Sequence, residues 1–435
     1  MSPVSEVVDL ELTAMAHGGF ALGRHAGRVV FVPYAIPGET VRVEIVETHD
    51  RWAQARLSEI LVPSPQRVEP PCPYFGPERC RGCHFQHIDY EAQAEIKRQV
   101  VADQLARVGG LHRVQVHDII AAAEPWSYRN HVTLTPAHPH PSPPSRSALG
   151  TLPERESEEP GGRFGFLSAD SHSVFPVEEC LIVDPLIDDA WSALDMDWPQ
   201  LQRLSLRCGS ATGDRMAIFE LDHYEDFDIE IDLAVSCVLL LADGEAVVLM
   251  GERYLTEQVA GRRYRVSAGS LFQVNTAGAE ALVAVVREFL EPKPHQSLVD
   301  LYCGVGLFAL ALADSVGRVT GIEIAPSAAA DFRHNALGLD HVDLIEETAE
   351  KALPQIAGPV DLMVLDPPRA GAGRQVIGEI CRLAPRRIAY VACDPAILAR
   401  DARWLTGSGY HLLGVQPVDL FPQTFHVECV ALFAR

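Results

Sequence analysis

A cysteine followed by an acid and a proline, in the string Tyr390-Val391-Ala392-Cys393-Asp394-Pro395, is the arrangement in this chain best suited to covalent chemistry. The apolar residues before it predict a buried parallel strand, so Cys393 stands where a strand ends and a loop opens. Open α/β sheets bind their ligands at such strand ends. A thiolate attacks well even when only a modest fraction is ionised, so we interpret Cys393 as a candidate nucleophile. The alternative is a small buried packing residue.

Acidic residues stand at the ends of three other predicted strands. Asp300 is followed by a turn with Gly304 and Gly306, the next strand ends at Glu323, and a third ends at Asp366. The two glycines allow a sharp turn and close approach to a ligand, and Glu323 could accept hydrogen bonds from both ribose hydroxyls. The third spaced glycine of a dinucleotide fingerprint is missing. The pattern therefore indicates a nucleoside cofactor without a pyrophosphate, which points to S-adenosylmethionine.

The order of these strand ends indicates how the chain is organised. Strands that alternate with helical segments predict an α/β, Rossmann-like domain over residues 269–435, and we expect a helix at 91–108 to pack with it. Short β-like runs between glycine turns predict an OB-like barrel over residues 1–64. A β-rich central domain should occupy residues 65–268. Residues 136–163, rich in proline, serine and glutamate, are expected to form a flexible insertion in it.

Cys72, Cys80 and Cys83 stand close together among proline and glycine residues, and Cys180 follows far downstream. This spacing is typical of a metal site, and four thiolates can hold either zinc or a [4Fe–4S] cluster. Zinc usually shows two paired C-x2-C knuckles, and only one pair is present. The chain has ten cysteines and no secretion signal, which argues for reduced thiols rather than disulfides.

Five ordered motifs over residues 270–430 resemble those of the RNA (uracil-5-)-methyltransferases, both the ribosomal-RNA and the tRNA enzymes. The motifs are Phe272-Gln273-Val274-Asn275, Asp300 to Gly306, Asp366 to Arg369, Cys393-Asp394-Pro395, and Phe421 to Glu428. The family usually has Asn after the cysteine. Here the residue is Asp394, and an acid beside a thiol tends to raise its pKa.

The resemblance implies an enzyme that transfers a methyl group from S-adenosylmethionine to C5 of uridine in RNA. The thiolate of Cys393 would add to uracil C6 and make C5 nucleophilic, and Glu428 would then remove the C5 proton. Arg369 or backbone amides would stabilise the enolate oxygen. The residues expected to bind the cofactor are Gln273, Tyr302, Glu323 and Asp366, together with Asp300, Gly304 and Gly306.

The resemblance extends to the N-terminal and cysteine-rich parts of the chain. The barrel resembles the TRAM module, an RNA-binding OB-like barrel. Its candidate phosphate contacts are Arg24, Arg28, Arg42, Arg51 and Arg56. The three-plus-one cysteine layout is similar to that of the ribosomal-RNA members and implies a [4Fe–4S] cluster on Cys72, Cys80, Cys83 and Cys180, in preference to zinc. The same layout favours ribosomal RNA over tRNA as the substrate.

Composition limits the partners. The 435 residues are 47% hydrophobic, which suits two or three domains, and no run reaches 18 apolar residues. We therefore expect a cytoplasmic monomer that binds no membrane. The net charge of −23 argues against a general RNA-binding surface and requires a local patch of arginines.

Two further functions remain possible from the sequence. One is a different S-adenosylmethionine enzyme that methylates amines, although such enzymes often have an aromatic residue where this chain has Arg369 and need no covalent cysteine. The other is a catalytically degenerate, RNA-binding iron–sulfur protein, which the acidic charge favours and the intact motifs oppose.

Overall fold

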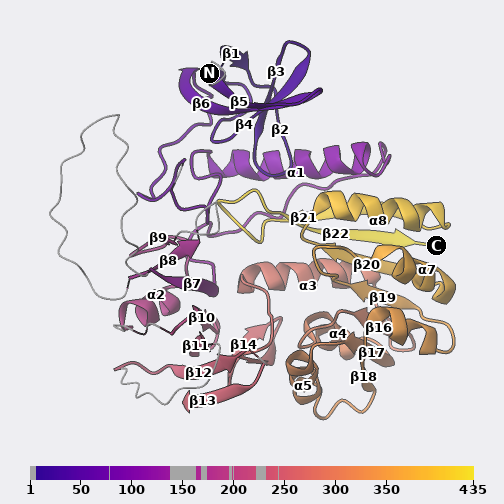
Figure 1. The fold of residues 1–435 in the computed structure, drawn as a ribbon. Coiled ribbons are helices and arrows are strands. Elements are labelled where there is room, and N and C mark those ends of the chain that lie inside the picture. The colour runs from indigo at the N-terminus through magenta and orange to yellow at the C-terminus, as the bar shows by residue number, and fades with distance from the viewer. Residues whose placement is uncertain are drawn as a thin grey trace.

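The computed structural model describes residues 6–77, 79–137, 163–167, 174–194, 198, 200–221, 232–242 and 244–435. The insertion expected at residues 136–163 lies outside these ranges except at its two ends, which belong to strands. Three large sheets make up the molecule, and one long helix lies between the first and the third (Figure 1). In the described residues no helix has both the length and the apolar character needed to cross a membrane.

The N-terminal sheet is an OB-like barrel in which the strands follow the order β1-β5-β6-β4-β3-β2. Its strands are β1 (Val7–Glu11), β2 (Ala14–Met15), β3 (Ala21–His25), β4 (Arg28–Val32), β5 (Thr40–Thr48) and β6 (Trp52–Val62). Alternate residues of β4 and β5, such as Val30, Val32, Val41 and Val43, fill its core because successive side chains of a strand point to opposite faces.

Helix α1 (Tyr90–Arg107) joins the barrel to the C-terminal sheet (Figure 1). The side chain of Asp89 caps the helix by accepting a hydrogen bond from the amide of Glu91 at 3.1 Å. One side of α1 packs with Ile36 of the barrel and with Phe85. The other side contributes Val101 and Leu105 to the core of the C-terminal sheet. Helix α1 therefore fixes the barrel on the C-terminal domain.

The central sheet has seven strands in the order β13-β12-β11-β10-β7-β8-β9. Its elements are β7 (His131–Ala137), β8 (Arg163–Leu167), β9 (Val174–Pro176), α2 (Pro185–Ser192), β10 (Arg203–Cys208), β11 (Arg215–Leu221), β12 (Ser236–Leu241) and β13 (Ala246–Met250). A separate hairpin, β14 (Tyr254–Val259) and β15 (Arg262–Ser267), leads into α3 (Thr276–Leu290).

The C-terminal sheet has the order β18-β17-β16-β19-β20-β22-β21. Its strands are β16 (Ser297–Leu301), β17 (Arg318–Glu323), β18 (Val342–Glu346), β19 (Leu362–Leu365), β20 (Arg387–Ala392), β21 (His411–Val418) and β22 (Glu428–Ala434). The first five are parallel, whereas β22 runs antiparallel between β20 and β21. The order of the strands along the sheet reverses between β16 and β19, because β17 and β18 follow on one side of β16, and β19 and β20 lie on the other. Such sheets bind ligands at this point.

Helices cover both faces of this sheet. They are α3, α4 (Leu307–Ala313), α5 (Pro326–Asn335), α6 (Ala349–Ala352), a short 3-10 turn (Leu353–Gln355), α7 (Gly373–Leu383) and α8 (Pro395–Gly407). Neighbouring strand residues pack into opposite cores: Leu298 meets the α3 and α4 side, and Val299 meets the side of α1, α7 and α8. The predicted Rossmann-like fold with an N-terminal OB-like barrel is confirmed.

Candidate active site

The register of the C-terminal sheet brings Cys393 and Glu428 to one edge. Strand β20 pairs antiparallel with β22 so that Ala392 lies opposite Cys429. Cys393 is the next residue after β20, and Glu428 is the first residue of β22, so the two side chains leave the sheet at the same end. Cys393 is half-buried, and Glu428 is only 4% exposed.

Burial and the charges around Cys393 favour the neutral thiol. Burial, followed by the nearby carboxyls of Glu428 and Asp366, raises the pKa of Cys393 to about 11, while Arg369 acts in the opposite direction. Burial and the neighbouring Asp366 likewise raise the pKa of Glu428 well above its ordinary value. The Oε2 atom of Glu428 is buried without a hydrogen-bond partner in the structure described. A buried carboxylate oxygen that lacks a donor is suited to accept a proton from a ligand.

Asp366 links the nucleophile to the Phe-Gln-Val-Asn motif. It follows β19, and its Oδ2 accepts a hydrogen bond of 3.3 Å from Nε2 of Gln273. Burial raises the pKa of Asp366 to about 6, although the bond from Gln273 works against this shift. Asn275 of the same motif caps α3 through the amide of Gly278 and donates to the carbonyl of Leu420 at 3.0 Å. The motif thus connects Asp366, at the end of β19, with Leu420, which follows β21.

The turn after β16 forms a cradle beside Glu323. Gly304 and Gly306 adopt left-handed conformations, with φ of +55° and +101°, and a Cβ at Gly304 would meet nothing within 4 Å. Glu323 accepts the amide of Gly304 at 3.0 Å and, with its other oxygen, the amides of Ile324 and Ala325. A carboxylate has about four acceptor sites, so Glu323 can still accept ribose hydroxyls.

Asp300 and Tyr302 complete this cradle. Asp300 is fully buried, and its Oδ2 accepts the amide of Ala309 at 2.8 Å. Its Oδ1 has no hydrogen-bond partner among the described residues, and burial raises its pKa well above the ordinary value. Tyr302 is half-buried with φ of +61°, an uncommon conformation for a residue with a side chain. An unsatisfied buried acceptor and a strained residue at one strand end fit a ligand site.

The loop between β21 and β22 is held by residues that sequence reasoning missed. Nζ of Lys97 donates to Asp419 at 2.6 Å and to the carbonyl of Phe421 at 3.0 Å, and both members of this ion pair are buried. Gln93, one turn earlier on α1, exchanges hydrogen bonds with Gln423. Breaking a buried ion pair costs about 3–5 kcal/mol, so this contact should fix the loop that leads to Glu428. Gln93 and Lys97 are four residues apart and therefore share one side of α1, and this spacing was the sequence feature that could have indicated their role.

The string Tyr128-Arg129-Asn130 also reaches this region. The hydroxyl of Tyr128 donates to the carbonyl of Pro422 at 3.0 Å, and Nδ2 of Asn130 donates to the carbonyl of Gln273 at 3.1 Å. The segment before β7 therefore supports both the loop before Glu428 and the motif that holds Asp366.

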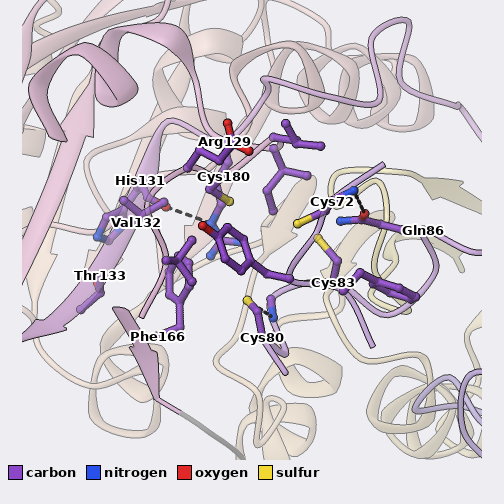
Figure 2. Close-up of a pocket in the computed structure, with 17 residues that line it drawn as sticks. Cys72, Cys80, Cys83, Gln86, Arg129, His131, Val132, Thr133, Phe166 and Cys180 are labelled. Carbon is purple, nitrogen blue, oxygen red and sulfur yellow. Dashed lines mark hydrogen bonds between the residues drawn. The ribbon is translucent and has the colours of Figure 1, made fainter. Parts of the chain in front are cut away.

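The four cysteines of the expected metal site line one cavity of about 240 Å³ between the segment after the barrel and the central sheet (Figure 2). Burial, with smaller contributions from the other thiols, raises the pKa of Cys83 to about 12. Burial also raises the pKa of Cys180, to about 11. Within the ranges that the structure covers, no three His, Cys, Asp or Glu side chains are arranged to hold a metal ion. The thiols surround a space rather than converge on a point.

Comparison with known proteins defines the class. A family model described as tRNA (Uracil-5-)-methyltransferase matches residues 232–435, and one for the TRAM domain matches residues 3–58. A protein of Streptomyces avermitilis named "Uncharacterized RNA methyltransferase" is 37% identical over 99% of this chain and 98% of its own length. A protein of Thermosynechococcus vestitus with a similar name is 33% identical over 98% and 97%.

A solved structure agrees with the fold. The tRNA (uracil-54, C5)-methyltransferase of Pyrococcus abyssi, in complex with S-adenosyl-L-homocysteine, superposes with a TM-score of 0.72 over 98% of this chain and 100% of its own, at 23% identity. Fold and site thus define an S-adenosylmethionine-dependent methyltransferase with an N-terminal TRAM domain. The chain belongs to the RNA (uracil-5-)-methyltransferase family.

Proposed function

We propose that this enzyme methylates C5 of a uridine in RNA through a covalent bond between Cys393 and uracil C6. The observation that carries the proposal is the common sheet edge at which Cys393, Glu428 and Asp366 meet. A half-buried thiol next to a buried carboxyl with a free oxygen matches the two tasks of the reaction, attack on C6 and removal of the C5 proton.

The covalent reaction has three steps, which are addition of the thiolate, methyl transfer and elimination. The Cys393 thiolate bonds to C6, the electron pair of the C5–C6 double bond forms a C4–C5 double bond, and the C4 carbonyl pair moves to oxygen as an enolate. C5 then bonds to the methyl carbon of the sulfonium that S-adenosylmethionine supplies, the enolate returns to the C4 carbonyl, and S-adenosylhomocysteine is the leaving group. Glu428 removes the remaining C5 proton, the C5–C6 double bond reforms, and the thiolate leaves. Arg369, whose charge lowers the pKa of Cys393, is placed to favour the thiolate and the enolate.

The cofactor would lie in the cradle formed by the ends of β16, β17 and β19. Glu323 would accept the ribose hydroxyls, and the free Oδ1 of Asp300 would accept a donor of the cofactor. The open space at Gly304 leaves room for the ligand beside the backbone. Gln273, Tyr302, Asp366 and Gly306 would line the remaining sides.

We propose a separate function for the part of the chain that contains each of the three sheets. We assign residues 1–64 to the RNA-holding barrel, 65–268 to the central domain with the cysteine site, and 269–435 to the catalytic domain.

A groove of about 720 Å³ on the barrel is lined by Arg24, Arg51, Phe31 and Trp52, and Arg107 of α1 borders it. Trp52 is 37% exposed and lies edge-on to Phe31 at 6.0 Å. Arginines with exposed aromatic rings suit single-stranded RNA.

The ion pairs and hydrogen bonds of the barrel arginines show which of the candidate phosphate contacts already have a partner. Arg42 forms ion pairs with Asp9 and Glu59, and Arg56 pairs with Glu44. Arg28 donates to the carbonyl of His49. In the part of the chain that the structure describes, Arg24 and Arg51 form no ion pair. Among the five candidate phosphate contacts of the barrel, these two arginines therefore have side chains free to meet phosphate.

We expect the double variant Arg24→Ala, Arg51→Ala to bind RNA more weakly and S-adenosylmethionine normally. Each lost phosphate contact should lower the slope of log K against log salt by about 1. Filter binding of RNA over a range of salt concentrations measures this slope. Arg42→Ala is the matched control, because its charge is already used by two carboxylates. An unchanged slope in the double variant would show that the groove does not hold RNA.

We further propose that Cys72, Cys80, Cys83 and Cys180 hold a [4Fe–4S] cluster. Each thiolate of such a cluster binds a different iron, so its ligands surround a cavity, as these four do, whereas a single zinc ion draws all four to about 2.3 Å from one point. The cluster takes no part in the methyl transfer, and its site would fix the central domain to the segment before α1.

Anaerobically purified enzyme should therefore be brown and contain about four irons per chain. Cys180→Ser should lose the colour and the iron, while Cys381→Ser, on α7, should keep both. Metal analysis and visible absorption measure the outcome. Stoichiometric zinc without iron would exclude the cluster.

Ribosomal RNA is the substrate we favour, on the resemblance of the barrel and cysteine site to that branch. The alternative is tRNA, which the superposing enzyme of Pyrococcus abyssi modifies by its name. Mapping 5-methyluridine in ribosomal RNA and tRNA from a strain without this enzyme decides between them. Loss of one site in ribosomal RNA supports our assignment, and loss confined to tRNA supports the alternative.

A further inference from the structure

One contact joins the barrel directly to the residue next to the nucleophile. Nε2 of His17 lies 3.5 Å from Oδ2 of Asp394, the residue that follows Cys393. His17 also lines the arginine groove, so it stands where that groove meets the catalytic loop. Both side chains are largely shielded from solvent, with 28% and 33% exposure.

The two oxygens of Asp394 have separate partners. Oδ1 accepts the amides of Ala396 and Ile397, at 2.8 and 3.1 Å, and so caps the N-terminus of α8. Oδ2 is the oxygen that faces His17. Burial acts to raise the pKa of Asp394, but the contacts from His17 and the two amides outweigh it and hold the pKa at about 2. Asp394 is therefore a fixed negative charge beside Cys393.

The barrel hairpin that carries His17 is held firmly against the catalytic loop. His17 lies in the tight turn between β2 and β3, with Gly18 and Gly19 in left-handed conformations. A Cβ at Gly19 would stand 3.2 Å from Phe425 and 3.3 Å from Phe85. The ring of His17 meets the ring of Phe425 edge-on at 6.2 Å. The position of His17 relative to Asp394 is thus set by packing on both sides.

We propose that His17 is a positioning residue for the nucleophile: it fixes Asp394 and offsets its negative charge, so that the barrel completes the surroundings of Cys393. A negative charge at Asp394 opposes formation of the Cys393 thiolate, as do Glu428 and Asp366. The imidazole on the outer oxygen of Asp394 reduces that opposition, because a hydrogen-bond donor there draws charge away from the carboxylate. This inference rests on the proposed covalent mechanism.

The test is the rate at which the full-length enzyme forms a covalent adduct with RNA containing 5-fluorouracil, at saturating RNA and S-adenosylmethionine. His17→Ala should slow adduct formation about tenfold, the effect of one pKa unit on the thiolate fraction, and saturating RNA keeps any change in RNA affinity out of this rate. Asp394→Asn keeps an acceptor for the α8 amides and removes the charge, so adding His17→Ala to it should have little further effect. A role in folding alone would not depend on the charge of Asp394.

A control variant and a replacement variant complete this experiment. His25→Ala, in the same barrel and likewise paired with a carboxylate, Glu6, should react as the wild type does. If His17→Ala does not fold, His17→Gln preserves its size and is measured in the same two backgrounds. An unchanged adduct rate, a defect in RNA affinity alone, or equal effects in both backgrounds would overturn the inference. A wild-type enzyme that forms no adduct would instead overturn the covalent mechanism itself.

Discussion

Replacing Cys393 with alanine is expected to abolish RNA methylation while S-adenosylmethionine still binds. Cys393 is the half-buried thiol at this sheet edge, whereas the neighbouring Cys429, opposite Ala392, is fully buried in the core and cannot reach a substrate. Turnover should fall roughly 100-fold or more, which corresponds to about 2.7 kcal/mol of barrier. Transfer of a radioactive methyl group to RNA measures turnover, and calorimetry measures cofactor binding.

The control for this variant is Cys381→Ala, which removes another partly exposed cysteine of the same domain. Cys381 lies on α7, away from the strand ends that form the site. It should retain normal turnover. Activity in Cys393→Ala above about 1% of the wild type would rule out Cys393 as the nucleophile.

Glu428→Gln should show a different defect, in which the methyl group is transferred and the RNA remains attached. Without a base the C5 proton stays, and the thiolate cannot leave until this proton is removed. The expected product is a stable complex of enzyme and methylated RNA. Denaturing gels with labelled RNA would show it as a shifted band.

The pH dependence of product release should distinguish the role of Glu428 as the base from the role of Cys393 as the nucleophile. The raised pKa of Glu428 means that release by the wild type accelerates as pH rises through that pKa, because only the ionised carboxylate accepts the proton. Glu346→Gln, at an exposed strand end in the same sheet, should behave as the wild type. Normal release by Glu428→Gln would place the base elsewhere.

Sequence patterns predicted the architecture because strand-end acids and glycine turns are local features. The Rossmann-like fold, the OB-like barrel and the methyltransferase class are confirmed. Apart from Gln273, which precedes α3, the residues proposed for the cofactor lie at the ends of β16, β17 and β19, because neighbouring parallel strands end at one edge of the sheet. Their roles in binding remain proposals, as does the division of the chain into three domains.

The sequence alone could not show what depends on register and long-range packing. The proximity of Glu428 to Cys393 follows from β22 inserting antiparallel between β20 and β21, an order that no local pattern encodes. The support of the catalytic loop by Lys97 and Gln93 joins residues more than 300 positions apart. The same holds for the contact of His17 with Asp394.

The central claim is the bond between Cys393 and uracil C6, and one measurement tests it most directly. The enzyme is incubated with S-adenosylmethionine and RNA containing 5-fluorouracil, in which fluorine replaces the proton that Glu428 would remove, so the adduct persists. After digestion, mass spectrometry identifies the peptide that carries the methylated nucleotide. We predict attachment at Cys393. Attachment at another residue, or methylated RNA with no adduct, would contradict the account.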